Sequence, residues 1–224
     1  MSPQHALHNP IFLAYLRIIF VSLVVGGIVL GILHLGFKKN LGSIWSTYRS
    51  WLVMAPVGLV AVFAGRVPTI VGVTVLAIFG FKEFARASGL YRDWWMTGAV
   101  YVGIIAVGIA SLIPQPHGLE PGTGWYGFFV AVPVFAIAVI LLVPILRNRA
   151  RGELQRMSLG IVGFVYIGWM FGHLGFLANA TNAYGYVIYV VFATELNDIA
   201  AFTFGQLFGR HPLRSEISPR KTWE

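Results

Sequence analysis

Long apolar runs recur along this chain, and they constrain its fold more than any other feature. An α-helix needs roughly 20 residues to cross about 30 Å of hydrocarbon, and several runs reach that length. Hydrophobic residues make up 57% of the 224 residues and charged residues only 11%. A soluble domain of this size needs more surface charge, and most segments here lack a polar face. The sequence therefore predicts an all-α fold, a polytopic transmembrane helical bundle.

About seven segments are expected to be spanning helices. They cover residues 11–37, 51–65, 67–81, 97–114, 125–146, 157–178 and 184–209. The second and third segments are short and adjoin at Arg66 and Val67, which predicts a tight helical hairpin. The last segment is long, and we expect its final third to project beyond the hydrocarbon.

Lysine and arginine residues gather in alternate loops. The basic stretches hold Lys38, Lys39 and Arg49, then Lys82, Arg86 and Arg92, then Arg147, Arg149, Arg151 and Arg156, and finally Arg210, Arg214, Arg220 and Lys221. Residues 113–124 and 179–185, which lie between them, hold no Lys or Arg. Cytoplasmic loops of membrane proteins carry this excess, so the pattern predicts an outside N-terminus and a cytoplasmic C-terminal tail. Arg66 is the exception.

The same distribution explains the net charge of +8 without nucleic acid. The basic residues sit at the ends of apolar segments, so the expected partners are membrane lipids. We predict an integral membrane protein, of a bacterial inner membrane. The 26 glycines are compatible with close helix packing and with a homodimer. Cysteine is absent, which excludes thiol nucleophiles and Cys-ligated zinc.

Two acidic residues lie well inside the last apolar segment. Glu195 and Asp198 are three residues apart, so they share one face of a helix. Carboxylates in a membrane usually line a polar cavity or meet a cation. Gly205 and Gly209 continue the same face and would allow close approach by a helix or a ligand. Two interpretations stay open, namely a functional carboxylate and a structural carboxylate paired with Arg17 or another buried cation.

The tail GRHPLRSEISPRKTWE (209–224) is basic and carries hydroxyl groups. Ser218, Lys221 and Thr222, with Arg210 nearby, could donate hydrogen bonds to phosphate oxygens. A basic tail beside a membrane helix also suits anionic lipid headgroups, and charge alone favours that second interpretation.

The 27 residues from Asp198 to Glu224 contain an Asp, an aromatic residue after Ala, then Gly-x-x-Phe-Gly-Arg and Ser-Pro-x-Lys-Thr-x-Glu. This order resembles the CTP:phosphatidate cytidylyltransferases, also called CDP-diacylglycerol synthases. The resemblance covers roughly an eighth of the chain without a gap. It implies transfer of a cytidylyl group from CTP to phosphatidate, which gives CDP-diacylglycerol and pyrophosphate with the help of Mg²⁺.

The resemblance also implies the site residues. Asp198 would belong to the metal and nucleotide site, and Lys221 would act with it in catalysis. The other residues would bind the CTP phosphates or leave room for them: Ser218, Thr222, Arg210, Gly205 and Gly209.

The family carries a further signature toward its C-terminus, with a Lys-Asp pair, His-Gly-Gly and an Asp-Arg-x-x-Asp-like segment. This sequence stops at Glu224, before the Gly that would complete the Ser-Pro motif. We therefore expect the chain to be part of a longer protein and to have little activity alone. Residues 1–183 would form the N-terminal transmembrane helices. Residues 184–224 would form a long helix with a cytoplasmic CTP-binding motif, the first part of a catalytic domain.

Three other functions remain open. A CTP-dependent polyisoprenoid-lipid kinase would share a nucleotide motif but transfer the γ-phosphate. A transporter could use Glu195 and Asp198 for ion coupling, although no repeated halves are visible in the sequence. A non-catalytic membrane subunit would suit a chain without the further signature.

Overall fold

The structure is a computed structural model, and it describes residues 1–35, 42–116, 124–214 and 218–223. Side chains are described in these ranges except at residues 33–35, 42–44, 47, 202, 203, 206, 207, 214 and 218–221.

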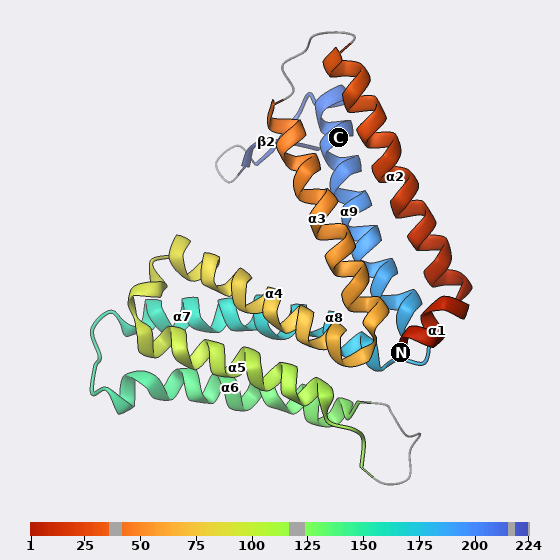
Figure 1. Cartoon of the computed structure of the whole chain (residues 1–224). Coiled ribbons are helices and arrows are strands. Elements are labelled where there is room, and N and C mark those ends of the chain that lie inside the picture. Colours follow the sequence, from red (N-terminus) through yellow and green to blue (C-terminus); the bar gives the residue numbers. More distant parts are fainter. Residues whose placement is uncertain (36–41, 117–123, 215–217, 224) are drawn as a thin grey trace.

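Helices dominate the described part of the chain (Figure 1). The α-helices are α1 (Pro3–His8), α2 (Pro10–Leu35), α3 (Gly42–Ala64), α4 (Arg66–Ala87), α5 (Trp94–Leu112), α6 (Tyr126–Leu146), α7 (Glu153–Gly163), α8 (Phe171–Phe176) and α9 (Ala183–Phe208). Short 3₁₀ turns η1 (Leu90–Arg92) and η3 (Leu177–Asn179) and the π-helical segment η2 (Phe164–Met170) connect some of them. Strands β1 (Pro212–Arg214) and β2 (Ser218–Thr222) follow α9. The all-α class is confirmed, and the small hairpin is an addition that the sequence did not predict.

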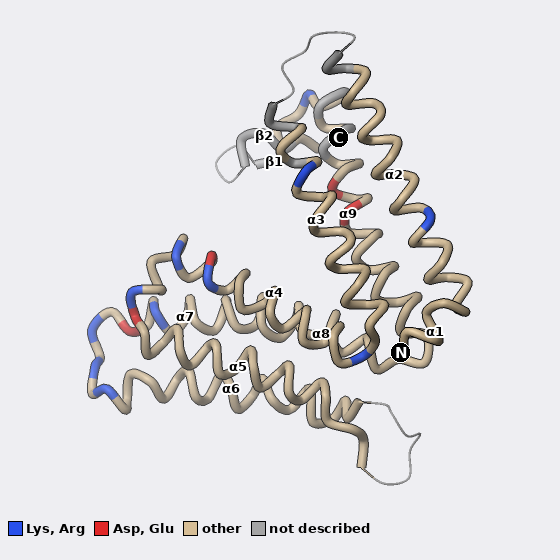
Figure 2. The backbone as a smooth tube through the Cα atoms, in the orientation of Figure 1, with Lys and Arg blue, Asp and Glu red and all other residues tan. Residues whose placement is uncertain are grey.

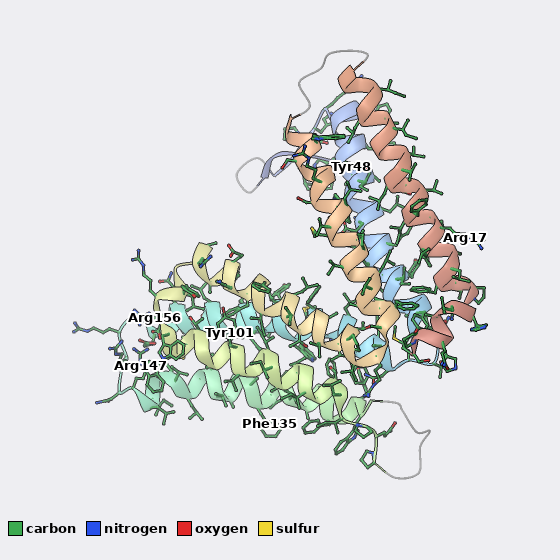
Figure 3. The ribbon with its side chains drawn as sticks, in the orientation of Figure 1. Arg17, Tyr48, Tyr101, Phe135, Arg147 and Arg156 are labelled. Atoms are coloured by element: carbon green, nitrogen blue, oxygen red, sulfur yellow. The ribbon has the colours of Figure 1, made fainter. Side chains whose placement is uncertain are left out.

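Five helical stretches in the described ranges are long and apolar enough to cross a membrane. They are Pro10–Ile32, Arg66–Ala87, Trp94–Leu112, Tyr126–Leu146 and Glu153–Asn179, and Tyr48–Ala64 is a shorter apolar helix. Many of their apolar side chains face outward, as Phe135 does with 69% of its surface exposed (Figure 3). Water would disfavour such a surface, and a lipid bilayer would not. The chain is therefore an integral membrane protein, while the expected count of seven spans is not established by length and composition.

The hairpin predicted between the second and third segments is present, but both helices are longer than expected. A single residue, Gly65, separates α3 from α4. Its φ of +115° lies where glycine is favoured, and an added Cβ would lie 3.2 Å from the Met1 carbonyl oxygen. The predicted bounds 51–65 and 67–81 were too short because they followed apolar runs only. Both helices continue through polar and basic residues at their other ends.

The helices form two groups that meet near the N-terminus (Figure 1). In the first group, α2 packs against α3 and α9. Tyr48 (Figure 3) donates its hydroxyl to the Leu23 carbonyl at 2.8 Å. The Tyr15 and Phe192 rings pack edge to face with their centroids 5.4 Å apart. The second group, α4 to α8, holds the larger core, whose fully buried side chains include Phe81, Met96, Ile104, Ile140 and Phe164.

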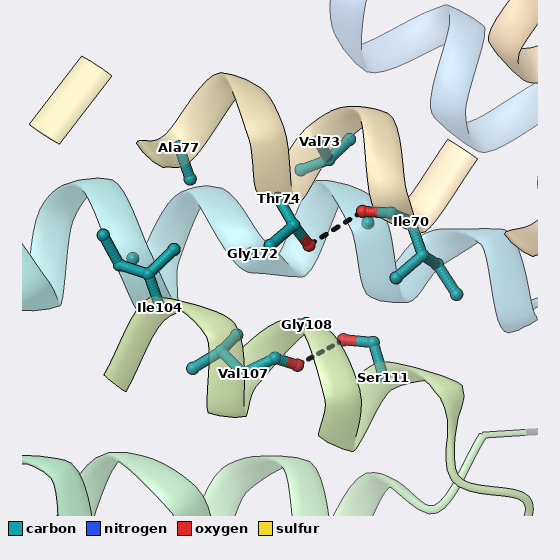
Figure 4. Close-up of a pocket in the computed structure, with 11 residues that line it drawn as sticks. Ile70, Val73, Thr74, Ala77, Ile104, Val107, Gly108, Ser111 and Gly172 are labelled. Atoms are coloured by element: carbon teal, nitrogen blue, oxygen red, sulfur yellow. Dashed lines mark hydrogen bonds between the residues drawn. The ribbon is translucent and has the colours of Figure 1, made fainter. Parts of the chain in front are cut away.

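Glycines in the 163–175 stretch allow the helices of the second group to approach closely. An added Cβ on Gly163 would lie 2.8 Å from a Phe81 ring carbon, and one on Gly172 would lie 2.6 Å from Val107 Cγ1. Between α4, α5 and α8 a cavity of only about 10 Å³ remains (Figure 4). That volume holds at most a single water, so this cavity is a packing gap and not a ligand site.

Arg66, the exception to the charge pattern, is fixed by hydrogen bonds. Its Nε donates to Asn179 Oδ1 at 2.6 Å, and its Nη2 donates to the Leu112 carbonyl at 3.0 Å and to the Ser111 carbonyl at 3.3 Å. These carbonyls belong to the last turn of α5, where they have no partner within the helix. Arg66 thus has a structural reason for its position. Most other Lys and Arg residues gather at helix ends remote from the N-terminus (Figure 2).

Candidate functional site

The end of α9 is the first element of the candidate site. The helix stops at Gly209, whose backbone is extended (φ −61°, ψ 116°) and whose N–H still donates to the Gly205 carbonyl at 3.1 Å. The chain then turns back toward the helix. This local geometry places the tail motif beside α9 and not away from it (Figure 1).

The tail folds into an antiparallel hairpin of β1 and β2. Pro212 pairs with Thr222 and Arg214 pairs with Ser218, with an irregular register between the two pairs. The Trp223 N–H donates to the His211 carbonyl at 3.0 Å and extends the pairing by one residue. The hairpin returns Thr222 to the end of α9.

Thr222 contacts both glycines that the sequence placed on the site face of the helix. An added Cβ on Gly209 would lie 2.7 Å from Thr222 Oγ1, and one on Gly205 would lie 3.5 Å from it. The Thr222 hydroxyl is buried and has no hydrogen-bond partner within the described residues. A buried hydroxyl without a partner costs about 1–3 kcal/mol, so a ligand that accepts its proton would be stabilised here.

The two carboxylates of α9 lie on the same helical face as this contact. Asp198 precedes Gly205 by seven residues, or two helical turns, which places them about 10 Å apart along the axis. The Asp198 side chain is exposed and Glu195 is half-buried. Neither forms an ion pair with another described residue. Arg17 points away from α3 and α9 (Figure 3), so the structural pairing of Arg17 with Asp198 finds no support.

The other predicted site residues are placed only partly. Arg210 follows Gly209 directly and is exposed. Ser218 and Lys221 lie in β2 by their backbone, but their side chains are outside the described residues. The structure therefore brings together Gly205, Gly209 and Thr222, and no pattern in the sequence indicated that a hairpin would do so. The stretch 218–222 has no alternation of apolar and polar residues that would predict a strand.

No group of three or more His, Asp or Glu side chains suited to a metal ion occurs among the described residues. Among the described residues, the carboxylates of α9 are Glu195 and Asp198, about two to three turns before Gly205. Mg²⁺ in proteins is commonly held by one or two carboxylates together with waters and substrate phosphates. These two residues could supply the carboxylate ligands of such a site.

Comparisons with known proteins point to one family. A family model described as the cytidylyltransferase family matches residues 45–224. The chain is 28% identical over 116 residues to a phosphatidate cytidylyltransferase of Staphylococcus haemolyticus, which covers 52% of this chain and 42% of that protein. It is 24% identical over 167 residues to one from Staphylococcus aureus, which covers 75% of this chain and 57% of that protein.

A shorter match concerns Mycobacterium bovis. Its phosphatidate cytidylyltransferase is 40% identical over 48 residues, which make up 21% of this chain and 16% of that protein. The chain spans about half the length of the first two relatives. No solved structure matches the chain.

Proposed function

Because the chain belongs to the cytidylyltransferase family, we propose that it takes part in transferring a cytidylyl group from CTP to phosphatidate. The products are CDP-diacylglycerol and pyrophosphate. The observation that carries the proposal is the contact of Thr222 with Gly205 and Gly209. It places a buried hydroxyl that has no partner among the described residues at the end of α9, within the part of the chain that matches the family.

In the proposed reaction, a phosphate oxygen of phosphatidate attacks the α-phosphorus of CTP. The new P–O bond forms in line with the bond to the β-phosphate, which breaks and releases pyrophosphate. Thr222 and Ser218 would donate hydroxyl protons to the CTP phosphates. Lys221 and Arg210 would bind the same oxygens by charge-assisted hydrogen bonds. Gly205 and Gly209 would let Thr222 lie against the helix beside the triphosphate, since a side chain at either position would meet Thr222.

Asp198, with Glu195 one turn earlier, would hold Mg²⁺ together with the phosphates. When bound, the metal offsets negative charge on the triphosphate and on the leaving pyrophosphate. The exposure of Asp198 and its freedom from any ion pair with a described residue support this role.

The proposal includes the orientation of the chain. Seven helices would cross the membrane with the N-terminus outside and the hairpin in the cytoplasm, where CTP is available. Two observations support it: most Lys and Arg residues gather at the helix ends remote from the N-terminus, and hydrogen bonds account for Arg66. The organisms of the relatives support a bacterial inner membrane. The division at residue 183 and a homodimer stay predictions.

The label position in CTP tests the reaction. The protein is expressed from its complete reading frame, purified, and incubated with phosphatidate, Mg²⁺ and CTP labelled at either the α- or the γ-phosphate. Cytidylyl transfer puts the α-label into lipid and leaves the γ-label in pyrophosphate. A lipid kinase would do the reverse, and labelled lipid from γ-labelled CTP would overturn the proposal.

Matched variants connect the reaction to the site. Asp198→Asn should lower the turnover number by at least about 100-fold, as removal of a charge that stabilises the transition state commonly does. Glu83→Gln is the control, because Glu83 is an exposed carboxylate that pairs with Arg86 at 3.3 Å. An equal loss of turnover in the Asp198→Asn and Glu83→Gln variants would contradict the role of Asp198.

A further inference from the structure

A second polar region lies at the end of the α4–α8 group, far from the α9 hairpin (Figure 1). There the α4–α5 connection meets the α6–α7 connection around a cavity of about 390 Å³. The charged residues that line it are Arg92, Asp93, Arg147, Arg149 and Arg156. Four arginines face one aspartate, so the lining carries an excess of three positive charges.

Asp93 fixes two of these arginines. Its carboxylate is nearly buried and accepts bonds from Arg147 Nη1 at 2.7 and 2.8 Å and from Arg156 Nη1 at 2.9 Å. It also accepts the Met96 N–H at the start of α5. Burial alone would raise the pKa of Asp93, but the hydrogen bonds from Arg147 and Met96 and the charges of both arginines lower it below its ordinary value. The carboxylate is therefore ionised at neutral pH and holds the guanidinium groups in place.

The arginines keep donors to spare. Arg147 and Arg156 each reach Asp93 through Nη1 alone, and a guanidinium has five N–H donors. Arg156 Nη1 also donates to Glu153 Oε1 at 3.0 Å, and counting Glu153 still leaves an excess of two positive charges. Arg92 and Arg149 form no ion pair with any described residue. Positive groups held together in this way favour a bound anion.

The surroundings of the cavity indicate where that anion comes from. Trp94 and Trp95 line the same cavity and are 76% and 59% exposed. Both stand at the start of α5, and exposed tryptophans at helix ends mark the level of lipid headgroups. Basic pockets between transmembrane helices bind anionic headgroups by the same combination of charge and position. A cavity of this volume is within the range of small-ligand sites.

We propose that this cavity binds the phosphate of an anionic phospholipid headgroup. Arg92 and Arg149 supply the unpaired guanidinium groups, and the pair held by Asp93 supplies further donors. The cavity shares no residue with the α9 hairpin site, so this inference does not rest on the proposed reaction. It needs only that α4–α8 cross a membrane.

Native mass spectrometry of the intact chain in neutral detergent tests the proposal. The probe is phosphatidylglycerol, whose phosphodiester makes it no substrate of the proposed reaction, and the substituted arginines lie outside the α9 hairpin site. The double variant Arg92→Gln/Arg149→Gln should weaken lipid binding on the order of tenfold or more, since it removes two charged donors. Arg151→Gln is the matched control, because Arg151 is exposed in the same connection but does not line the cavity. Circular dichroism and gel filtration show whether each variant folds.

Four results would overturn the proposal. The first is equal affinity of the folded double variant and the unmodified chain for phosphatidylglycerol. The second is a loss of affinity in Arg151→Gln as large as that in the double variant, because the effect would then come from net charge and not from the cavity. The third is equal binding of phosphatidylcholine, whose headgroup has no net charge. The fourth is binding of inorganic phosphate without binding of lipid, which would make the ligand a soluble anion.

Discussion

The helical threonines whose side chains the structure describes all donate their hydroxyls to backbone carbonyls. Thr74 donates to the Ile70 carbonyl and Thr97 donates to the Asp93 carbonyl, both at 2.8 Å (Figure 4 shows the first). Thr222 lies in a strand that packs on a helix end, where no carbonyl one turn earlier is within reach. Its buried hydroxyl is therefore left for an acceptor outside the described residues, which is the condition under which a polar group binds a ligand.

Thr222→Val separates ligand binding from folding. The substitution keeps the shape and removes a hydroxyl that has no described partner, so the melting temperature should stay equal or rise slightly. The affinity for CTP should fall about tenfold, the equivalent of one hydrogen bond to a charged group. Equilibrium binding of labelled CTP measures it. Thr222→Ser should restore the affinity, and Thr74→Val should not change it.

Through Asp93, the stability of the folded protein depends on pH. Its folded pKa is below the ordinary value of 3.8, so it contributes stability that is fully present above that value. The contribution is lost as the pH falls through the lower, folded pKa, where the ion pairs with Arg147 and Arg156 break. We expect the melting temperature in detergent to fall below about pH 4. Asp93→Asn should lower the melting temperature at neutral pH and flatten this dependence, and an unchanged acid profile would contradict the assignment.

At the scale of elements, the glycines of α7, η2 and α8 explain how the second group packs. Four of them face the side chains or backbone of α4 and α5 at close range: Gly163, Gly168, Gly172 and Gly175. The π-helical segment η2 lies in the middle of this stretch. A helix that carries glycines on one face can approach its neighbours closely, and the membrane offers no other strong force for association.

Gly163→Ala tests this packing. The new Cβ would lie 2.8 Å from a Phe81 ring carbon and 2.9 Å from a Phe84 ring carbon, and Phe81 is fully buried. Overpacking of this kind costs about 1–3 kcal/mol, so the melting temperature should fall. Gly98→Ala in α5 is the control, because an added Cβ there meets nothing within 4 Å and alanine favours the helix. A smaller loss in Gly163→Ala than in Gly98→Ala would refute the close approach.

The sequence predicted helices well and their partners poorly. Each predicted apolar run coincides with a helix in the described ranges, and five of these helical stretches are long and apolar enough to span a membrane. An apolar run in lipid must satisfy its backbone hydrogen bonds internally, which favours a helix. The prediction followed hydrophobicity alone, so it missed the helix ends that contain charged and polar residues. For this reason α3 and α4 were predicted too short. Asp93 stands directly before α5, where an N-cap residue is expected, but its arginine partners are 54 and 63 residues away in the chain. Contacts at that separation come from the packing of helices, and no local pattern predicts them.

In the candidate site, too, local sequence patterns predicted some residues but not the contacts between them. Asp198, Gly205 and Gly209 follow from helical periodicity, and the basic, hydroxyl-bearing tail indicated the phosphate-binding candidates. The resemblance then assigned roles to both sets. The meeting of Thr222 with the two glycines depends on the hairpin, which the polar and proline-containing tail did not indicate.

For the whole molecule, the two groups of helices present their basic ends away from the N-terminus (Figure 2). The chain contains no cysteine, so single cysteines can report its orientation without a background. In intact cells, a membrane-impermeant maleimide should label Gln4→Cys from outside. It should label Ala150→Cys, in the α6–α7 connection, only after the membrane is opened. The reverse pattern would place CTP and the hairpin on opposite sides of the membrane and would end the proposed orientation.

The single-residue turn at Gly65 has a consequence for lipid traffic. Because α3 and α4 reverse direction there, α4 starts near the N-terminus, as α9 does, and the two helices end away from it in different directions (Figure 1). Three apolar stretches lie between them, α5, α6 and α7 to η3, so in the proposed topology α4 and α9 would cross the membrane in the same direction. The arginine cavity after α4 and the hairpin after α9 therefore open toward the same leaflet when the helices span the bilayer. In the proposed topology, a lipid that leaves one of them would reach the other by lateral diffusion within one leaflet, and its headgroup would not have to cross the hydrocarbon.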